Sequence, residues 1–451
     1  MASSIRLKFK EGAASFYVVA FSTLVLVIIA ASFAAIILSE MTRTENDDLS
    51  QSAYDSALAG IEDAKLAFYN YQSCKEQGIS SATSKPTGAG SITCAEIIYW
   101  MEHPDCDMVA HILGRIGKDE NGEVMIQETK EGGDNSMQQA YTCVRINTKV
   151  NDYRSTLTED NPTRVVKVKL SSTAANNIER VRVSWYSRTD GTDLAYTNVS
   201  SSRVQFPTLR DGKAATPPTL AVGLVQTADS FYFSSFDEVT SSATNRATVY
   251  LVPTDSVTMA SGSSRPDNYI GAYADGENTL TAAQVIKSND RAVKNIPFAV
   301  YCPRNLEYNG FACSAIMDLP DAIGGARNDD TFMFVISIPY GQPSTDFALE
   351  FLCAEGQTCG TVSVEGTEVA SEQAVLEGVQ VNIDSTGRAN NLYRRVEARL
   401  DSADTFFPYP LYAIELLNDK ASGYLLNKNM TVTREFSEGT YGGNLEDLRA
   451  R

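Results

Sequence analysis

The chain has 451 residues, a formal net charge of −18 and only two histidines. Binding to nucleic-acid phosphates needs a concentrated basic surface, so this acidic balance argues against a nucleic-acid partner. The length is sufficient for two folded domains, each with its own hydrophobic core.

An uncharged, largely apolar run over residues 13–38 follows a basic stretch at the N-terminus. The run contains no proline or glycine, and as a helix it would be about 39 Å long, which is enough to cross a hydrocarbon layer of roughly 30 Å. It is longer than the apolar core of a secretory signal peptide, and no small-residue cleavage site follows it. We therefore expect residues 13–38 to remain in the cytoplasmic membrane as a single span.

The charges that flank this span predict its orientation. Arg6, Lys8 and Lys10 precede it, and basic flanks stay in the cytoplasm, so the rest of the chain is expected outside. The cysteines agree with this orientation, because all eight lie beyond the span, where an oxidising compartment favours disulfides. They form two clusters of four: Cys74, Cys94, Cys106 and Cys143, then Cys302, Cys313, Cys353 and Cys359. The connectivity stays open, but Cys302 and Cys313 flank a turn-rich loop, and Cys353 and Cys359 flank an expected hairpin tip. These short spacings suggest that Cys302 pairs with Cys313 and Cys353 with Cys359.

Helical periodicity continues beyond the span. Apolar and small residues recur at spacings of three and four from Leu49 to Tyr71, which predicts one continuous helix over residues 13–72. Gly60 lies on this stripe, and we interpret it as a point of close packing against the external part of the chain.

Residues 73–206 have a mixed pattern that predicts an α/β globular domain. A short helix is expected over Cys94–His103, followed by a second from the N-cap Asp105 to about Ile116. Two alternating segments, 166–170 and 181–185, predict strands that each have one apolar face. We expect that apolar face to be the surface on which the second half of the long helix packs.

The next segment, 207–219, is rich in proline and turn residues and is interpreted as a linker. Strand patterns with frequent turns fill residues 220–434 and predict a β-sandwich-like domain, and a polar tail follows over 435–451. The fold class is therefore α+β: a long N-terminal transmembrane helix, then a disulfide-bonded, mostly antiparallel β-rich extracellular region in two modules. The predicted strands cover residues 248–252, 296–302, 332–339, 347–353, 360–364, 379–383, 396–400 and 411–417.

Two stretches of sequence resemble a known family. The first is Lys10-Glu11-Gly12-Ala13-Ala14-Ser15-Phe16 before the apolar run, and the second is the Ala-rich stretch from Gln51 to Ala64. Together they resemble the N-terminal region of type IV pilin-like proteins, most of all the PilX-type minor pilins and the large GspK-type minor pseudopilin of type II secretion. The resemblance covers about the first 72 residues.

This resemblance implies a processing step and a set of partners. A prepilin peptidase would remove the basic leader, residues 1–12, by cutting between Gly12 and Ala13. The helix would then leave the membrane and join other pilin or pseudopilin subunits through the filament assembly machinery. Most pilins carry a glutamate at the fifth mature position, where it neutralises a neighbour's N-terminal ammonium group, but Tyr17 occupies that position here. A subunit without this glutamate fits best at the tip of a pilus, where its β-rich body would present an adhesion or assembly surface to an unknown ligand.

An alternative interpretation is a single-pass, membrane-tethered surface binding protein that never enters a filament. A third is an ectoenzyme, which we do not favour because the chain has no motif for a nucleophile, a zinc protease or a phosphate-binding loop. We expect no cofactor and no metal site: His103 and His111 are separated by a helix-breaking proline, and the acidic turns at 190–193 and 328–330 lack the spacing of a calcium loop. The aromatic run at 406–410 is interpreted as packing rather than as an adhesive patch, and the charged segment 392–400 as an ordinary strand.

Overall fold

The computed structural model divides the chain into two compact units. Unit 1 comprises Met1–Asn147 and Ile383–Ala398, and unit 2 comprises Thr148–Asn382 and Arg399–Arg451. In sequence, therefore, most of unit 2 is inserted into unit 1. The residues that the structure describes are 11–86, 91–115, 123–126, 138–168, 178–187, 216–227, 246–254, 278–281, 283–285, 297–302, 308–323, 331–339, 344–364, 367–401, 414–419 and 423–428.

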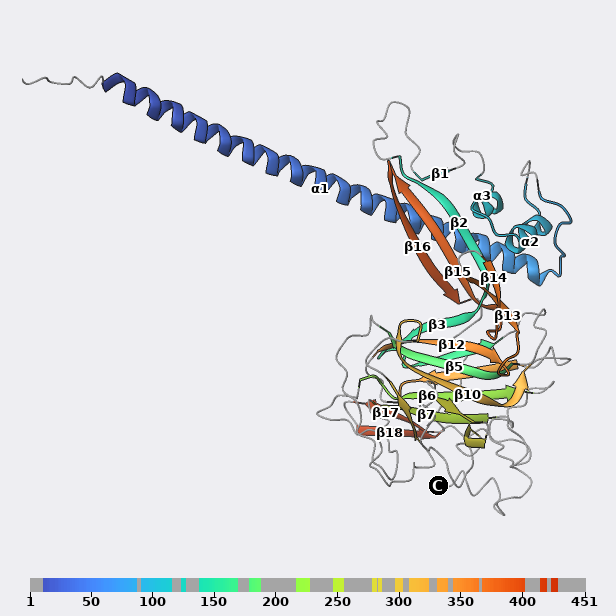
Figure 1. Cartoon of the computed structure of the whole chain (residues 1–451). Coiled ribbons are helices and arrows are strands. Elements are labelled where there is room, and N and C mark those ends of the chain that lie inside the picture. Colours follow the sequence, from blue (N-terminus) through green and yellow to red (C-terminus); the bar gives the residue numbers. More distant parts are fainter. Residues whose placement is uncertain are drawn as a thin grey trace, which may run out of the picture. The chain divides into compact units, whose positions relative to one another are not determined.

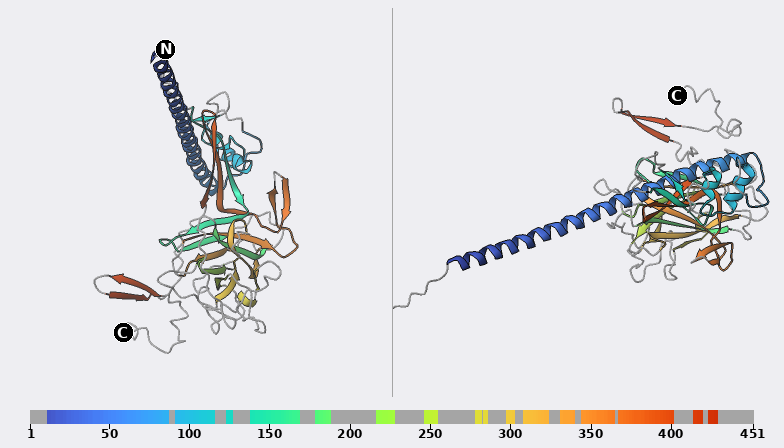
Figure 2. Two further views of the ribbon diagram at one scale, coloured as in Figure 1. Left: turned by 60° about the vertical axis from the view of Figure 1, so that its left-hand side comes forward. Right: turned by 90° about the horizontal axis from the view of Figure 1, so that it is seen from above.

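Unit 1 begins with the predicted long helix, α1, which runs without a break from Glu11 to Glu76. Figures 1 and 2 show it as one continuous coil. The absence of proline and the scarcity of glycine allow backbone hydrogen bonds to continue over all 66 residues. The prediction of a continuous helix is confirmed, with ends a few residues beyond those expected.

Two short helices follow in unit 1. Helix α2, Cys94–Glu102, begins at a capping box in which the Thr93 backbone N–H donates to Glu96 Oε2 at 2.7 Å. Helix α3, Met108–Ile112, is shorter than predicted and begins later. Asp105 does not cap it: its Oδ1 accepts from the Asp107 backbone N–H at 3.1 Å, which forms a turn before the helix instead.

Unit 1 also contains part of a four-stranded sheet with the order β1-β2-β15-β16. Two disulfides stabilise the unit: Cys74–Cys94 joins the end of α1 to α2, and Cys106–Cys143 joins the α2–α3 segment to β2. Three of the four strands also continue into the sequence of unit 2. The strands are β1 (Val124–Met125), β2 (Ala140–Val150), β15 (Leu376–Ala389) and β16 (Leu392–Asp401).

Unit 2 contains two five-stranded sheets whose pairing is mostly antiparallel; only β8–β10 and β7–β9 are parallel among the described pairs. The first sheet has the order β3-β12-β5-β10-β8, and the second has the order β4-β11-β6-β7-β9. Strands of the first sheet are β3 (Asp152–Leu157), β12 (Thr345–Cys353), β5 (Ile178–Ser187), β10 (Phe311–Ile323) and β8 (Thr279–Leu280). Strands of the second sheet are β4 (Thr163–Val168), β11 (Thr331–Ser337), β6 (Leu220–Thr227), β7 (Arg246–Thr254) and β9 (Pro297–Tyr301).

The two sheets of unit 2 share one hydrophobic core. Alternate residues of each strand enter it, as in β5, where Val181, Val183 and Trp185 are fully buried. The sheets contact each other through side chains such as Phe334 of β11 and Phe351 of β12, whose ring centroids lie 5.4 Å apart in an edge-to-face arrangement. This is the face-to-face packing of a β-sandwich.

The structure of unit 2 differs from two predictions made from the sequence. Strands β4 and β5 do not form the surface on which α1 packs, because they belong to different sheets of unit 2 and their apolar faces are buried in its core. The predicted boundary at residues 207–219 also differs from the division that the structure shows. Pro217 and Pro218 are buried, and the Pro218 carbonyl accepts a hydrogen bond from Trp185 Nε1 at 3.0 Å, so this end of the segment is part of the sandwich.

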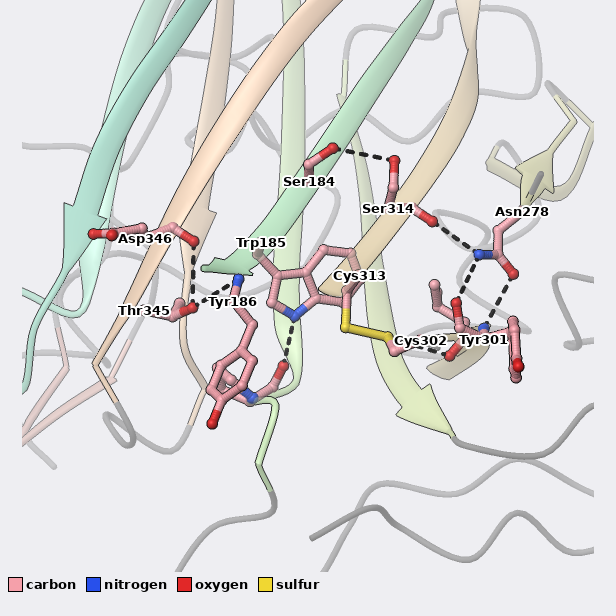
Figure 3. Close-up of a disulfide and its surroundings, with 12 residues drawn as sticks. Ser184, Trp185, Tyr186, Asn278, Tyr301, Cys302, Cys313, Ser314, Thr345 and Asp346 are labelled. Carbon is pink, nitrogen blue, oxygen red and sulfur yellow. Dashed lines mark hydrogen bonds between the residues drawn. A yellow bond between two sulfur atoms is a disulfide. The ribbon is translucent and has the colours of Figure 1, made fainter. Parts of the chain in front are cut away.

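The disulfide Cys302–Cys313 lies beside a buried polar network (Figure 3). Asn278 Nδ2 donates to the carbonyls of Tyr301 and Ser314 at 2.9 Å each, and Asn278 Oδ1 accepts from the Tyr301 backbone N–H at 3.0 Å. One amide side chain therefore satisfies backbone groups of β9 and β10, which belong to different sheets. The network and the disulfide together join the two layers at this end of the sandwich.

Two hairpins complete the described strands. Strands β13 (Gly360–Val364) and β14 (Thr367–Ser371) pair with each other, as do β17 (Ile414–Asp419) and β18 (Gly423–Lys428). The fourth disulfide, Cys353–Cys359, was expected at a hairpin tip. It instead connects the end of β12 to the base of the β13–β14 hairpin, since β12 pairs with β3 and β5 and not with β13.

Candidate functional site

The first half of α1 exposes an unusually large apolar surface. Every side chain that the structure describes from Phe16 to Asp48 is exposed; Tyr17, for example, is 72 % exposed. An apolar patch of this extent marks a surface that another molecule or a membrane covers. The large apolar side chains on it are Phe16, Tyr17, Val18, Val19, Phe21, Leu24, Val25, Leu26, Val27, Ile28, Ile29, Phe33, Ile36, Ile37, Leu38 and Met41.

By length and composition this helix can cross a membrane, with a mean hydropathy of 2.7 over its most apolar 18 residues. Its hydroxyl groups do not prevent this. Ser22, Thr23 and Ser32 each donate to a backbone carbonyl three or four residues earlier, at distances of 2.8–3.0 Å. Because these donors are satisfied within the helix, they need no water.

The residues predicted to take part in processing lie at the start of α1. Gly12 and Ala13 are in its first turn, since the helix begins at Glu11. The first turn of a helix has backbone N–H groups without intrahelical partners and opens at low cost. A peptidase that binds its substrate in an extended form would therefore need to unwind only this turn.

The second half of α1 is buried against β2 and β15, within unit 1. Ala53, Ala57 and Ala64 are 0 % exposed, and Ser385 Oγ of β15 donates to the Ala57 carbonyl at 2.7 Å. This bond joins the sheet directly to the backbone of the helix. Such an approach is possible only because the side chains between the two elements are small.

Two glycines bring the helix and the sheet into this close contact. A Cβ added at Gly60 would collide with Ser385 Oγ and would lie 2.8 Å from Val144 Cγ2. A Cβ added at Gly387 would collide with the α1 backbone at Ala53 and Ala57. The interpretation of Gly60 as a close-packing residue is confirmed, and its counterpart on the sheet is Gly387.

Polar contacts at the margins fix the helix in register. Asp63 accepts hydrogen bonds from Arg115 and from the Tyr141 hydroxyl, the latter at 2.8 Å. Burial, together with the carboxylate of Asp63, raises the pKa of Tyr141 far above its usual range, so this hydroxyl remains a donor at every physiological pH. Towards the apolar half, Arg394 Nε of β16 donates to Ser50 Oγ at 2.8 Å.

Together, these contacts divide α1 into two halves with different environments. The side chains of residues 16–48 are exposed, whereas the stripe from Ala53 to Phe68 is packed against the sheet and the short helices. A rigid rod thus connects an apolar surface to a folded body. No protein-family model, curated protein or solved structure matches the chain.

The other residues singled out from the sequence, the cysteines and the two histidines, form disulfides or stack on aromatic rings. The eight cysteines form four disulfides, and the two pairs that the spacing suggested, Cys302–Cys313 and Cys353–Cys359, are among them. His103 stacks on Tyr99 and His111 stacks on Trp100, with ring centroids 4.3 and 4.1 Å apart. Within the described ranges, no group of three or more His, Cys, Asp or Glu side chains could hold a metal ion.

Some sequence predictions fall outside the described residues. These are the acidic turns at 190–193 and 328–330, the aromatic run at 406–410 and the tail at 435–451. Conversely, Ser385, Gly387 and Arg394 were not predicted to contact α1. No local signal identifies them, because they lie more than 300 residues from their helix partners in sequence.

Proposed function

We propose that this chain is a non-enzymatic, minor pilin-like subunit of a type IV pilus or a related filament, placed at or near the tip. The observation that supports the proposal best is the two-part helix: an exposed apolar half continuous with a half that is packed against a sheet through alanine and glycine. A rod of this kind can be covered by lipid before assembly and by similar helices afterwards, because both present apolar surfaces.

The proposed topology places the N-terminus in the cytoplasm and both units outside. Arg6, Lys8 and Lys10 favour this orientation. The four disulfides favour an oxidising compartment for the folded units. In this proposal the partners are other pilin or pseudopilin subunits, the prepilin peptidase and the filament assembly machinery.

Tyr17 supports the tip position. Its phenol cannot neutralise an ammonium group, and residues 13–38 contain no acidic side chain. A neighbour's N-terminus buried next to this helix would carry an unpaired charge at considerable cost. The same feature would also suit the competing possibility, a single-pass membrane-tethered surface protein.

The mature N-terminus separates these possibilities. Intact-mass analysis of the chain purified from cell membranes and from sheared filaments is expected to find a form that begins at Ala13. Gly12→Val is expected to block cleavage, because a branched side chain would prevent close approach of the backbone to the peptidase. The matched change Ala14→Val alters neither residue of the cleaved bond, so cleavage is expected to continue. A chain that keeps its first 12 residues in cells, and is absent from filaments, would contradict the proposal and favour the tethered protein.

The tip position needs its own measurement. Filaments labelled with antibody against unit 2 and viewed by electron microscopy are expected to carry label at their ends only. Label along the whole shaft would refute the tip position while leaving assembly intact. Label on the cell envelope alone would refute both.

A further inference from the structure

Unit 2 has an open depression of about 450 Å³ at one end of its first sheet. Strands β3, β5, β10 and β12 all contribute to it. Its volume is within the usual range for small-molecule sites in proteins, about 300–1,000 Å³. The lining residues that bear on its chemistry are Arg154, Thr156, Ser187, Asn309, Phe311 and Asp346.

Strand register places a cation and an anion side by side in this depression. Thr156 of β3 is directly opposite Asp346 of β12, and Arg154 is opposite Ala348. Arg154 and Asp346 are therefore diagonal neighbours on the same face of the sheet, a separation that their side chains can span. A ligand in the depression would contact a guanidinium and a carboxylate together.

The guanidinium of Arg154 is held in position by its neighbours. Its Nε donates to Asp152 at 2.6 Å, and Asp152 also accepts from Arg399 Nη1 at 2.9 Å. The group lies 5.7 Å from the ring centroid of Phe311. Among the residues that the structure describes, its two terminal nitrogens have no hydrogen-bond partner, and they can donate to a ligand without loss of the bond to Asp152.

Asp346 already accepts hydrogen bonds from hydroxyl groups, the kind of donor that we expect in a ligand. Its two carboxylate oxygens accept from the hydroxyls of Thr156 and Ser187, at 2.6 and 2.9 Å. The Thr156 hydroxyl also carries lone pairs that can accept from a ligand. Asn309 adds a side-chain amide at the rim, held by a bond of 2.9 Å from its Nδ2 to Glu350 Oε1, so its carbonyl oxygen is a further acceptor.

The edge of the sheet next to the depression is not available for an added peptide strand at this point. Gln380 Oε1 accepts from the Arg154 backbone N–H at 3.2 Å, and Gln380 Nε2 donates to the Arg154 carbonyl at 2.8 Å. A side-chain amide thus occupies the backbone groups that a peptide would need for strand addition. The net charge of −18 and the carboxylate of Asp346 also disfavour an anionic ligand.

We propose that this depression binds an uncharged saccharide. Neighbouring hydroxyls on a sugar ring can accept from the terminal nitrogens of Arg154 and donate to Asp346 at the same time. Phe311 is only 4 % exposed, so the polar groups and not ring stacking provide the recognition. This site rests on the proposed function, because it gives the external part of the pilin-like subunit, unit 2, a class of ligand.

The test uses the full chain in nanodiscs or phosphocholine micelles, because glycoside detergents would compete for the depression. An array of neutral hexose and N-acetylhexosamine oligosaccharides identifies a bound sugar, and saturation-transfer NMR measures its affinity. Arg154→Gln and Asp346→Asn are each expected to weaken binding about tenfold or more, because each removes a hydrogen bond to a charged group. Lys167→Gln and Glu355→Gln make the same charge changes at exposed positions of unit 2 outside the depression and are expected to leave the affinity unchanged.

Thermal unfolding followed by tryptophan fluorescence verifies that each variant is folded, and Thr156→Val provides a milder change in the same depression. Failure of the native chain to bind any neutral saccharide would overturn the proposal. Binding that all three depression variants leave unaltered would also overturn it, as would binding of acidic saccharides or peptides alone. These outcomes are independent of the N-terminal mass measurement, so the saccharide site and the filament proposal can fail separately.

Discussion

The contact between α1 and β15 predicts that Gly60→Ala destabilises unit 1, although alanine is the better helix former. At an exposed helical position, the change from glycine to alanine stabilises by about 1 kcal/mol. At Gly60 the added methyl would collide with Ser385 Oγ and press on Val144 Cγ2 at 2.8 Å. Overpacking of this kind costs about 1–3 kcal/mol. Displacement of Ser385 would also break its 2.7 Å bond to the Ala57 carbonyl, at a cost of about 1 kcal/mol. The net expectation is a loss of about 1–3 kcal/mol in the free energy of unfolding.

The two tryptophans make this measurement possible. Trp100 of α2 belongs to unit 1 and Trp185 of β5 belongs to unit 2, and both are buried. In a Trp185→Phe background, urea unfolding of the chain in detergent micelles can be followed by the fluorescence of Trp100 alone. All variants are compared within that background, so any effect of the tryptophan change on unit 2 is common to them.

A matched pair at Leu58, two residues before Gly60 and 37 % exposed, provides the control. Leu58→Ala is expected to be about 1 kcal/mol more stable than Leu58→Gly, which is the opposite order to that expected at position 60. Ser385→Ala should recover part of the loss caused by Gly60→Ala, with a coupling of at least about 0.5 kcal/mol. If Gly60→Ala is neutral or stabilising, the close packing of α1 on the sheet does not limit stability, and the reasoning is wrong.

Two further changes test other parts of the fold. Burial lowers the pKa of His111 below its ordinary value of 6.5, more than Asp105 and Asp107 raise it, and Lys85 acts in the same direction as burial. The unfolded state then binds the proton more readily, so the free energy of unfolding of unit 1 is expected to fall as the pH drops below about 6.5. In urea titrations at pH 5 and pH 8, His111→Phe should reduce the difference in this free energy between the two pH values. An unchanged difference would contradict the prediction. Replacing Cys302 and Cys313 by serine opens a loop of 11 residues and is expected to cost unit 2 about 2–4 kcal/mol, measured by Trp185 fluorescence in a Trp100→Phe background, with no effect on unit 1. A loss of unit 1 stability of the same size would show that the two units do not unfold separately.

The features that the sequence predicted correctly depend on local patterns. Helix α1 follows from a long stretch without proline, and α2 was expected over Cys94–His103, close to its observed bounds of Cys94–Glu102. The alternation of Val181, Val183 and Trp185 predicted a strand with one buried face, and all three are buried. Spacing also suggested the two disulfides in the second cysteine cluster, because the two cysteines of each pair are close together in sequence.

The features that were missed depend on contacts between distant parts of the chain. Alternation shows that one face of β5 is buried, but it does not show whether a helix or a second sheet covers that face. The sheet that α1 packs on includes residues 376–389, and nothing in the composition of that segment marks it as a partner of residues 53–64. Gly387 is informative only in retrospect, because a glycine within a strand also occurs at bulges and bends. In the candidate site, similarly, the apolar half of α1 was predicted, but the contacts that anchor its other half were not.

The discontinuous course of the chain through unit 1 has a consequence for biosynthesis. When the ribosome has completed residue 147, α1, the two short helices and most of β2 have been made, but β15 and β16, which complete the sheet on the alanine stripe, have not. Most of unit 2 is synthesised in the interval, and it has its own core and two of the four disulfides. Residues 376–398 arrive only afterwards, so the sheet on α1 can close only late in synthesis. Until then the part of the stripe that β15 covers, at Ala53 and Ala57, is accessible to a chaperone, and a chain truncated before residue 383 should expose it permanently.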